Sequence, residues 1–415
     1  MSLIPIKLSE NLQLQKLGVS QANIGFYTLS IESDKYICVC DKNSSPPQVV
    51  IIDVANPAKN TKYPIKADSA RMSPTSNLIA LKAGLNIQVY DGSQGKKMKA
   101  TVLPEEAVFW KWVTHSVIAF VSQTAVYHWS TDDSSESVIK IFERSSDLAN
   151  AQVISYKTDL SLQWFALVCL SAQANIVTGK IQLFSSQRSA SQIIDGQACT
   201  FINYKMDCNK ASSLLFSFSN RSPSASKLFI IELGQPSAGN QQYPKKSLDM
   251  SYPADTASDF PLSMHSHESS GILFIITKVG LTYLYEIESG SCIFLNRISN
   301  DPIFVSVDLL QGDGFMCVNR VGFVLSVSIN KEQIVPYLIS KKFESIAYNL
   351  AARTGYPGAE GAFLSKFNEF FSKNMFEEAS LIAARSTGTS IRNAQTIARF
   401  KALPPQPGAT SSPLY

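Results

Sequence analysis

Two histidines separated by a single residue have a spacing that could support metal binding. His265 and His267 would share one face of a strand, and Glu268 follows them directly. Imidazole pairs bind zinc when further ligands complete a tetrahedron. We place them in a polar turn region, Ser263 to Ser270, with no third ligand in reach. The sequence therefore predicts no metal site.

Catalytic motifs of several enzyme classes are missing. The sequence has no GxxxxGK[ST] phosphate loop, no GxGxxG after a strand, no GxSxG nucleophile elbow and no HExxH zinc motif. A Ser–His–Asp triad draws its members from distant positions, and serine is too frequent here for any one to stand out. We expect a protein that is not an enzyme and that needs no cofactor.

A lysine cluster beside apolar residues suggests peptide binding. Lys96, Lys97 and Lys99 are interrupted only by Met98, and strand alternation predicts that Lys97 and Lys99 share a face. Residues of neighbouring predicted strands could form the floor of the same groove: Ile51, Ile79 and Tyr90. An apolar floor with a cationic rim suits an extended peptide that is hydrophobic and has an acidic end. A solvated charged face is the alternative interpretation.

The composition favours a globular protein and argues against several functions. Hydrophobic residues make up 45% of the 415 residues, enough for a large core. The net charge of +4 is too small to indicate a nucleic-acid-binding face. No apolar run approaches the ~20 residues that cross a bilayer, and we find no secretory signal pattern. Seven cysteines without a CxxC pair indicate reduced thiols in a cytosolic protein.

Repeated pairs of apolar strands provide the elements that would position these side chains. Each pair consists of two alternating apolar runs joined by a short turn. Seven pairs recur: 36–40 with 49–53, 78–82 with 86–90, 117–121 with 125–129, 164–170 with 180–184, 213–219 with 227–232, 272–277 with 281–286, and 314–318 with 321–327. They recur about every 45 residues, the period of four-stranded propeller blades. We predict an all-β seven-bladed β-propeller over residues 1–330, with a β-sandwich or irregular all-β domain as the alternative.

Two details follow from a propeller. A strand from Leu3 to Leu8 could join the last blade and close the ring, because closure removes exposed sheet edges. The tryptophans would mostly lie in the core between blades, whereas an exposed tryptophan in a groove would be a recognition anchor. They stand at positions 110, 112, 129 and 164.

The sequence after residue 330 predicts helices. Apolar residues follow helical spacing in four segments: 337–353, 363–371, 376–384 and 391–403. Paired short helices without strands are typical of the start of an α-solenoid. We therefore expect residues 331–415 to form a short α-helical solenoid segment that begins a longer rod in a longer protein. The stretch that follows Leu403 is rich in Pro and Ser.

Short motifs along the whole chain carry a family resemblance. They include Leu12-Gln-Leu-Gln-Lys-Leu-Gly18, Ala22-Asn-Ile-Gly-Phe26, Gln48-Val-Val-Ile-Ile-Asp53, Phe109-Trp-Lys-Trp112, Ala125-Val-Tyr-His-Trp-Ser130, Asn296-Arg-Ile-Ser299, Lys366-Phe-Asn368 and Pro405-Gln-Pro-Gly408. In these motifs the sequence resembles the clathrin heavy chain family, specifically its terminal domain and the linker that follows. The resemblance implies a seven-bladed propeller that binds short linear motifs.

Three binding sites are implied by the resemblance. A groove between the first two blades would bind the clathrin box, leucine-hydrophobic-x-hydrophobic-acidic, through Ile51, Ile79, Asn86, Gln88, Tyr90, Lys96 and Lys97. A pocket at the top centre would bind a Trp-containing motif through Phe26, Gln152, Ile154 and Leu170. A groove between the fourth and fifth blades would bind an arrestin-type leucine-rich loop through Trp164, Leu183, Arg188 and Gln192.

The first groove departs from the family at five positions. The family usually has Ile, Arg, Thr, Phe and Lys where this sequence has Thr61, Tyr63, Asn86, Tyr90 and Gly95. We expect this chain to retain the groove and to differ slightly from the family in its preference for the acidic end of the peptide. The Tyr90 hydroxyl must reach water or a partner.

The resemblance also implies a cellular role. The chain would belong to a structural protein of vesicle coats in endocytosis and intracellular transport, at the cytoplasmic face of coated pits and vesicles. Its partners would be adaptor and accessory proteins, with other heavy chains and light chains bound through parts absent here. It would reach the membrane only through adaptors and would bind no nucleic acid. Another coat or scaffold propeller is the alternative, and a propeller enzyme is a more distant one.

Overall fold

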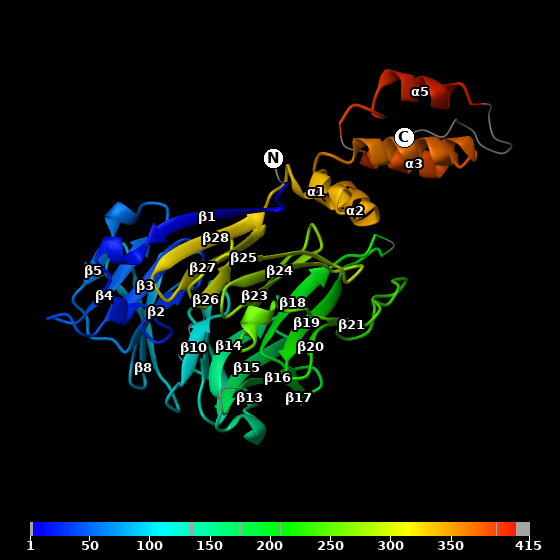
Figure 1. Ribbon diagram of the computed structural model, residues 1–415. Coiled ribbons are helices and arrows are strands. Elements are labelled where there is room, and N and C mark those ends of the chain that lie inside the picture. The colour runs from blue at the N-terminus through cyan, green and yellow to red at the C-terminus, as the bar shows by residue number, and fades with distance from the viewer. Residues whose placement is uncertain (1–2, 133–136, 174–175, 208, 387, 404–415) are drawn as a thin grey trace.

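Seven four-stranded antiparallel sheets, followed by five α-helices, form the molecule in the computed structural model (Figure 1). The structure describes residues 3–132, 137–173, 176–207, 209–386 and 388–403. The predicted seven-bladed propeller is confirmed, and each predicted strand pair forms the second and third strands of one blade. The tail with Pro405-Gln-Pro-Gly408 and the Cys208 thiol lie outside the described residues, and the six described cysteines are free thiols.

The first three blades are formed by consecutive strands. Blade 1 contains β2 (Leu29–Ile31), β3 (Tyr36–Asp41), β4 (Gln48–Asp53) and β5 (Thr61–Tyr63). Blade 2 contains β6 (Ser69–Met72), β7 (Leu78–Ala83), β8 (Asn86–Asp91) and β9 (Lys97–Val102). Blade 3 contains β10 (Phe109–Trp112), β11 (Val117–Val121), β12 (Ala125–Ser130) and β13 (Ile139–Glu143).

The remaining blades repeat this order until the last. Blade 4 contains β14 (Gln152–Thr158), β15 (Trp164–Gln173), β16 (Ile176–Ser185) and β17 (Ala190–Asp195). Blade 5 contains β18 (Ala198–Tyr204), β19 (Ser213–Arg221), β20 (Ser226–Glu232) and β21 (Lys246–Asp249). Blade 6 contains β22 (Pro261–His267), β23 (Ile272–Thr277), β24 (Leu281–Glu286) and β25 (Cys292–Arg297). Blade 7 contains β26 (Ile303–Asp308), β27 (Gly314–Asn319), β28 (Phe323–Ile329) and β1 (Ile6–Gln13).

The ring is closed by the N-terminal strand, as predicted. β1 pairs antiparallel with β28 from Ile6↔Ile329 to Gln13↔Phe323. The strand begins later than the expected Leu3 and extends further along the chain. Pro5, which has no N–H to donate to a ladder, comes directly before it. The first and last segments of the propeller therefore share one sheet.

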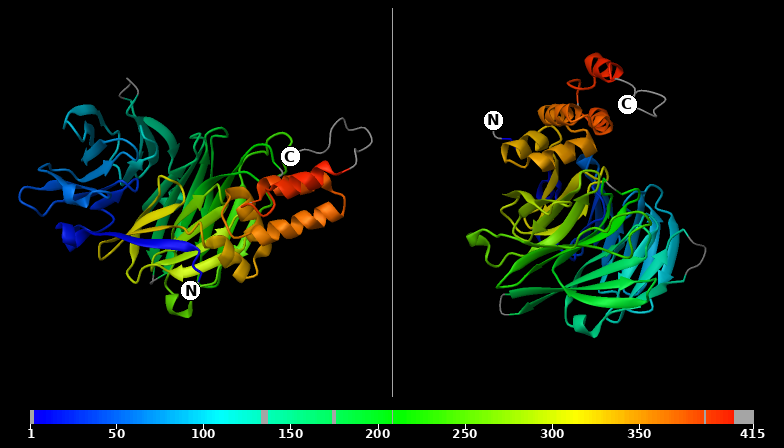
Figure 2. Two further views of the ribbon diagram at one scale, coloured as in Figure 1. Left: turned by 90° about the horizontal axis from the view of Figure 1, so that it is seen from above. Right: turned by 90° about the vertical axis from the view of Figure 1, so that its right-hand side faces the viewer.

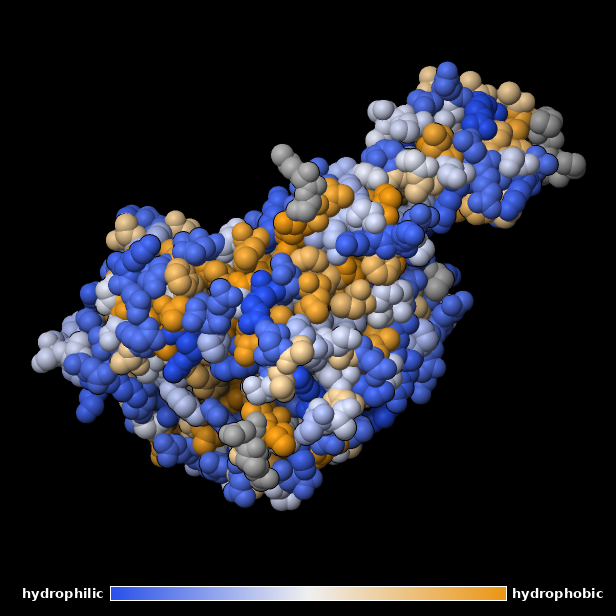
Figure 3. Space-filling view, viewed as in Figure 1, coloured by the Kyte–Doolittle hydropathy of each residue, from blue (hydrophilic) through white to orange (hydrophobic). Residues whose placement is uncertain are grey.

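The core lies between the blades. Every pair of neighbouring blades shares one hydrophobic cluster, because both faces of each middle strand are apolar. Trp110, Trp112 and Trp129 are buried between blades 2 and 3, which confirms their predicted place in the core. Trp164 is half-buried between blades 4 and 5. On the face shown in Figure 3, hydrophilic residues cover much of the surface and apolar residues form patches between them.

Among its described residues, the helical segment has five α-helices where four were predicted. They are α1 (Ile334–Ser340), α2 (Glu344–Thr354), α3 (Glu360–Ser372), α4 (Phe376–Arg385) and α5 (Ala394–Lys401). The single helix predicted over 337–353 is divided because Lys342 takes a left-handed conformation, with φ at 64°. The Phe343 N–H returns to the Leu338 carbonyl and the Lys342 N–H to the Ile339 carbonyl, which is a Schellman cap without glycine. Short 3-10 helices occur at η1 (Leu14–Leu17), η2 (Gln21–Asn23), η3 (Pro57–Lys59), η4 (Ser146–Leu148) and η5 (Ala254–Thr256).

The helices continue the propeller core and project away from it (Figure 2). One hydrophobic cluster runs from blades 6 and 7 through α1 to α5. Arg353 of α2 donates to the Lys205 carbonyl at 2.8 Å and to Glu288 at 3.2 Å, and its guanidinium lies over the Tyr204 ring. These contacts fix the first helices against blades 5 and 6.

Candidate peptide-binding sites

The groove between blades 1 and 2 has an apolar floor. Ile51 and Ile79 are almost fully buried and belong to the hydrophobic cluster shared by these two blades. Tyr90 is half-buried, is paired with Ile79 in register, and packs against the same cluster. The alternation of β8 puts Asn86 and Gln88 on the same face as Tyr90. The structure thus brings Ile51 of blade 1 together with four residues of the β7–β8 hairpin of blade 2.

Two tyrosine hydroxyls at this groove have protein partners. The Tyr90 hydroxyl donates to the Gln88 amide oxygen at 2.6 Å, so it is satisfied without a ligand. The Tyr63 hydroxyl, from the outer strand of blade 1, donates to the Gly92 carbonyl of blade 2 at 2.9 Å. Tyr63 therefore ties the two walls of the groove together at the end near the β8–β9 turn.

A β-bulge decides which lysines face this groove. Tyr90 pairs with Lys97 and Val89 pairs with Lys99, so Met98 is an extra residue in β9. Lys97 consequently lies on the Tyr90 face, toward blade 1, whereas Lys99 lies on the face toward blade 3. The expectation that both lysines share a face is wrong, because it assumed unbroken alternation. Lys96 is exposed in the turn that precedes β9.

The bulge also adds two residues that sequence reasoning missed. Ala100 pairs with Gln88, and Val102 pairs with Asn86, so both lie on the groove face. Val102 is 62% exposed although it is apolar. An apolar residue near the lysines could have indicated a further contact for a peptide. The alternation assumed from Lys97, however, placed Val102 on the opposite face of the strand.

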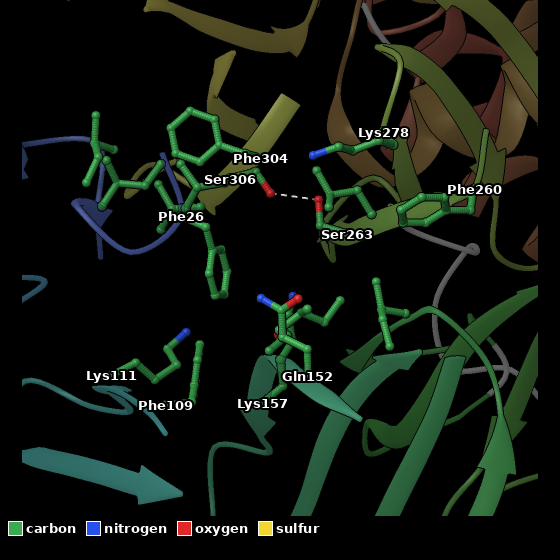
Figure 4. A pocket seen from close by; sticks show the side chains of 18 of the residues that line it. Phe26, Phe109, Lys111, Gln152, Lys157, Phe260, Ser263, Lys278, Phe304 and Ser306 are labelled. Atoms are coloured by element: carbon green, nitrogen blue, oxygen red, sulfur yellow. Dashed lines mark hydrogen bonds between the residues drawn. The ribbon is translucent and has the colours of Figure 1, made fainter. Parts of the chain in front are cut away.

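A pocket of about 360 Å³ occupies the centre of the propeller (Figure 4). It is lined by all four residues predicted for the top-centre site, which are Phe26, Gln152, Ile154 and Leu170. Gln152 and Leu170 are direct partners on β14 and β15. We call this cavity the central pocket.

Three β-bulges shape the wall of the central pocket. The innermost strands of blades 4, 6 and 7 each carry one unpaired extra residue: Ile154, Leu262 and Phe304. All three line the pocket. A bulge bends its strand and changes the direction of a side chain. The three bulges therefore explain why these apolar side chains point into the pocket and depart from the regular alternation of their strands.

An aromatic loop of blade 1 reaches across the pocket. Phe26 stacks on Phe109 of blade 3 with ring centroids 6.4 Å apart. The neighbouring Tyr27 is 69% exposed, and its hydroxyl accepts a 2.7 Å hydrogen bond from the Gln152 amide. Gln152 is therefore held in place by a residue from another blade before any ligand binds.

One polar part of the pocket wall consists of paired charges. Glu32 forms an ion pair with Arg71, and Lys111 lies 4.0 Å from its second oxygen. Burial lowers the pKa of Lys111, and the Glu32 charge opposes that change. These side chains come from the innermost strands of blades 2 and 3 and from the loop after β2, and all three line the central pocket.

His265 lies in this wall and not in a turn, which corrects the expectation for the two histidines. Both are on β22, and His265 contacts Asp308 through Nδ1 at 2.7 Å and Ser306 through Nε2 at 2.8 Å. Burial lowers the pKa of His265. Burial raises the pKa of Asp308, but His265, Lys157 and Lys111 outweigh it and keep that carboxyl ionised. His267 contacts the hydroxyls of Ser269 and Ser270 instead.

Neither a cluster of metal ligands nor a membrane-spanning helix occurs within the described ranges. Among these residues no group of three or more His, Cys, Asp or Glu side chains could hold a metal ion. Across the same part of the chain, no helix has the length and apolar character to span a membrane.

The groove between blades 4 and 5 gathers the third predicted set. Trp164 and Leu183 pack in the cluster shared by these blades, with Phe229 and Ile231 on the blade 5 side. Gln192 pairs with Leu183 and is exposed. Arg188 is exposed in the turn between β16 and β17. The arrangement is an apolar groove with polar side chains along one edge.

Comparison with known proteins identifies relatives over the whole chain. A family model described as Clathrin-H-link matches residues 355–415. Clathrin heavy chain 2 of Homo sapiens is 42% identical over 410 residues, which cover 99% of this chain and 25% of the human protein. The clathrin heavy chain of Drosophila melanogaster is 40% identical over 412 residues, covering 99% of this chain and 24% of the fly protein. The clathrin heavy chain of Dictyostelium discoideum is 37% identical over 419 residues, with the same coverage of 99% and 24%.

The relatives are longer than this chain. The chain spans about a quarter of the length of the curated relatives it matches. Among solved structures, one chain in the crystal structure of the mitotic checkpoint complex matches with a TM-score of 0.51 at 9% identity. The match covers 79% of this chain and 96% of that chain. At this identity the likeness concerns the fold alone.

Proposed function

Because this chain belongs to the clathrin heavy chain family, we propose that it is the peptide-binding part of a structural protein of vesicle coats, without a catalytic role. It would act in endocytosis and intracellular transport at the cytoplasmic face of coated pits and vesicles. Adaptor and accessory proteins would be its partners, and contacts with other heavy chains and light chains would use parts outside this sequence.

The groove between blades 1 and 2 carries the proposal. Its floor of Ile51 and Ile79 suits the hydrophobic side chains of a clathrin-box peptide. Lys97 lies at the edge of the same face and suits the acidic end of the motif. The supporting observation is that the ladder puts a cation on the face of the apolar floor and directs the second lysine away from it.

The energetics favour weak single contacts. Two or three buried leucine-type side chains contribute about 1.5–3 kcal/mol each. Ordering a flexible peptide and losing its translational freedom offset much of this gain. Single motifs would then bind on the order of micromolar to sub-millimolar dissociation constants. Repeated motifs that meet several propellers in one lattice would supply the avidity.

Two further sites extend the proposal. The central pocket would take a Trp-containing motif, since Phe26, Ile154 and Leu170 give it an apolar wall and Gln152 supplies a polar group. The groove at Trp164 and Leu183 would take a leucine-rich loop, with Arg188 and Gln192 along its edge.

A pull-down tests the proposed function. The purified chain is passed over an immobilised clathrin-box peptide and over a control peptide in which the leucine is replaced by alanine. We expect retention by the first peptide and not by the second, because the alanine cannot fill the apolar floor. Equal retention by both peptides, or by neither, would contradict the proposal.

A further inference from the structure

Lys278 extends into the central pocket from the turn that follows β23 (Figure 4). Its backbone is fixed on both sides, since its N–H donates to the Phe260 carbonyl at 3.0 Å and its carbonyl accepts from Ile303 at 2.9 Å. Burial lowers the pKa of this lysine, and the positive charge of Arg320 lowers it further. The Arg320 N–H donates to the Pro302 carbonyl at 2.9 Å, one residue before the Ile303 N–H that binds Lys278, so both cationic residues lie beside the same segment.

Arg320 is exposed and lies next to the same wall. Its guanidinium carbon lies 5.9 Å from the centroid of the Phe304 ring, which lines the central pocket. One guanidinium nitrogen would be only 2.8 Å from a Cβ atom on Gly25, so the missing side chain there leaves room for it. The loop that carries Phe26 thus packs against Arg320 on one side and opens to the pocket on the other.

The acids that line the pocket already have other partners. Glu32 pairs with Arg71, and Asp308 with His265. Among the residues that the structure describes, no ion pair within 4.0 Å joins Lys278 or Arg320 to an acid. Two neighbouring cations without an acid, next to aromatic rings, create a local excess of positive charge. A bound carboxylate would relieve their repulsion.

We propose that Lys278 and Arg320 form a carboxylate-binding subsite at the central pocket, so that its peptide ligand carries an acidic residue near its aromatic residue. This inference rests on the proposed peptide binding by the central pocket and names the class of peptide. The pocket volume and the rings of Phe26, Phe109 and Phe304 suit an aromatic side chain. The two cations are complementary to the charge of its acidic neighbour.

A charge-swap titration tests the subsite. Fluorescent octapeptides contain one Trp and carry Asp at one position between one and three residues from it. Matched Asn peptides are the neutral controls and matched Lys peptides the controls of opposite charge. Anisotropy at low salt measures their affinity for the wild-type chain and for Lys278→Gln, Arg320→Gln and Lys278→Glu. Lys401→Gln, a change of an exposed lysine on α5, serves as the surface control. Thermal melting verifies that each variant is folded.

We expect at least one Asp peptide to bind about three- to fivefold more tightly than its Asn control, a gain that corresponds to one charge pair. The preference should be lost in Lys278→Gln and in Arg320→Gln, reversed in favour of a Lys peptide in Lys278→Glu, and kept in Lys401→Gln. If the Asn peptides bind as well as the Asp peptides, the subsite is refuted while the proposed peptide binding stands. If no Trp peptide binds, both are refuted.

Discussion

Lys97 and Lys99 lie on opposite faces of β9, although only Met98 separates them. Lys97 shares the Tyr90 face. Lys99 donates to the Ser130 carbonyl at 2.9 Å and lies 5.5 Å from the Trp129 ring centroid, so it is engaged with blade 3. One lysine is thereby available to the groove between blades 1 and 2, and the other stabilises the contact between blades 2 and 3.

The first prediction uses this pair as its own control. Lys97→Gln should weaken the binding of a clathrin-box peptide about three- to fivefold, because one exposed charge pair is worth up to about 1 kcal/mol. Lys99→Gln should leave the affinity within about twofold and lower the free energy of unfolding instead, since a hydrogen bond from a charged donor is worth about 1.5–3 kcal/mol. Calorimetric titration and urea unfolding measure the two effects. Equal loss of affinity in both variants would contradict the assignment of faces.

The same strand shows what sequence reasoning could and could not predict. The seven strand pairs were visible because buried middle strands are continuously apolar, and this pattern is local. The bulge at Met98 was not visible, because register depends on pairing with β8 and not on the residues of β9 alone. The bulges at Ile154 and Phe304 could not be predicted for the same reason.

Other features that the sequence did not predict have comparable physical causes. The break at Lys342 could not be predicted, because a left-handed cap usually has glycine or asparagine, and lysine gives no such signal. The Tyr27–Gln152 contact joins residues 125 positions apart, so no local pattern indicates it. Strand pattern and charge indicated Ile51, Ile79, Tyr90 and the lysines of the first groove, whereas the other members of the predicted sites were named from the family resemblance. Only the folded chain shows which of these side chains share a face.

A second prediction concerns the Tyr90 hydroxyl. Tyr90→Phe should tighten binding of the clathrin-box peptide about two- to fivefold. A bound peptide must remove water from the Tyr90 hydroxyl, and this cost is absent for a phenylalanine ring. The Gln88 amide oxygen, its present partner, is half-buried and can turn to solvent. Calorimetry on the two proteins decides the point. Weaker binding by the Phe variant would show that the hydroxyl contacts the ligand.

A third prediction separates the central pocket from the groove. Gln152→Leu combined with Ile154→Gln should abolish binding of a Trp-containing peptide, because it exchanges the polar and apolar groups of the pocket wall. It also removes the amide that holds Tyr27. Affinity for the clathrin-box peptide should remain within about twofold, since the mutated residues lie in blade 4. Loss of clathrin-box binding in this variant would show that the sites are coupled.

A fourth prediction follows from a histidine buried in the core. His128 Nε2 lies 2.9 Å from the Tyr156 hydroxyl, and burial lowers the pKa of His128 to about 4. The unfolded chain binds a proton near the ordinary value of about 6.5. Between these two pKa values the unfolded chain binds a proton at His128 and the folded chain does not. The contribution of neutral His128 to the free energy of unfolding is therefore fully present above about pH 6.5. It is lost as the pH falls toward 4, by at most about 3 kcal/mol.

Urea unfolding at pH 7 and pH 4.5 measures this loss. His128→Gln should lose less free energy of unfolding than the wild type over that range. His115→Gln, which changes a side chain that is 68% exposed, should behave like the wild type. A His128 variant with the same pH dependence as the wild type would contradict the proposed cause.

Isoleucine-methyl NMR tests the central claim most directly. The chain carries labelled isoleucine methyl groups, the signals of Ile51 and Ile79 are assigned with Ile→Val variants, and a clathrin-box peptide is titrated. Both residues lie in the floor of the groove between blades 1 and 2. We expect concentration-dependent shifts of these two signals, with little effect from the Leu→Ala control peptide. Binding that shifts only isoleucines outside this groove, or no binding at all, would contradict it.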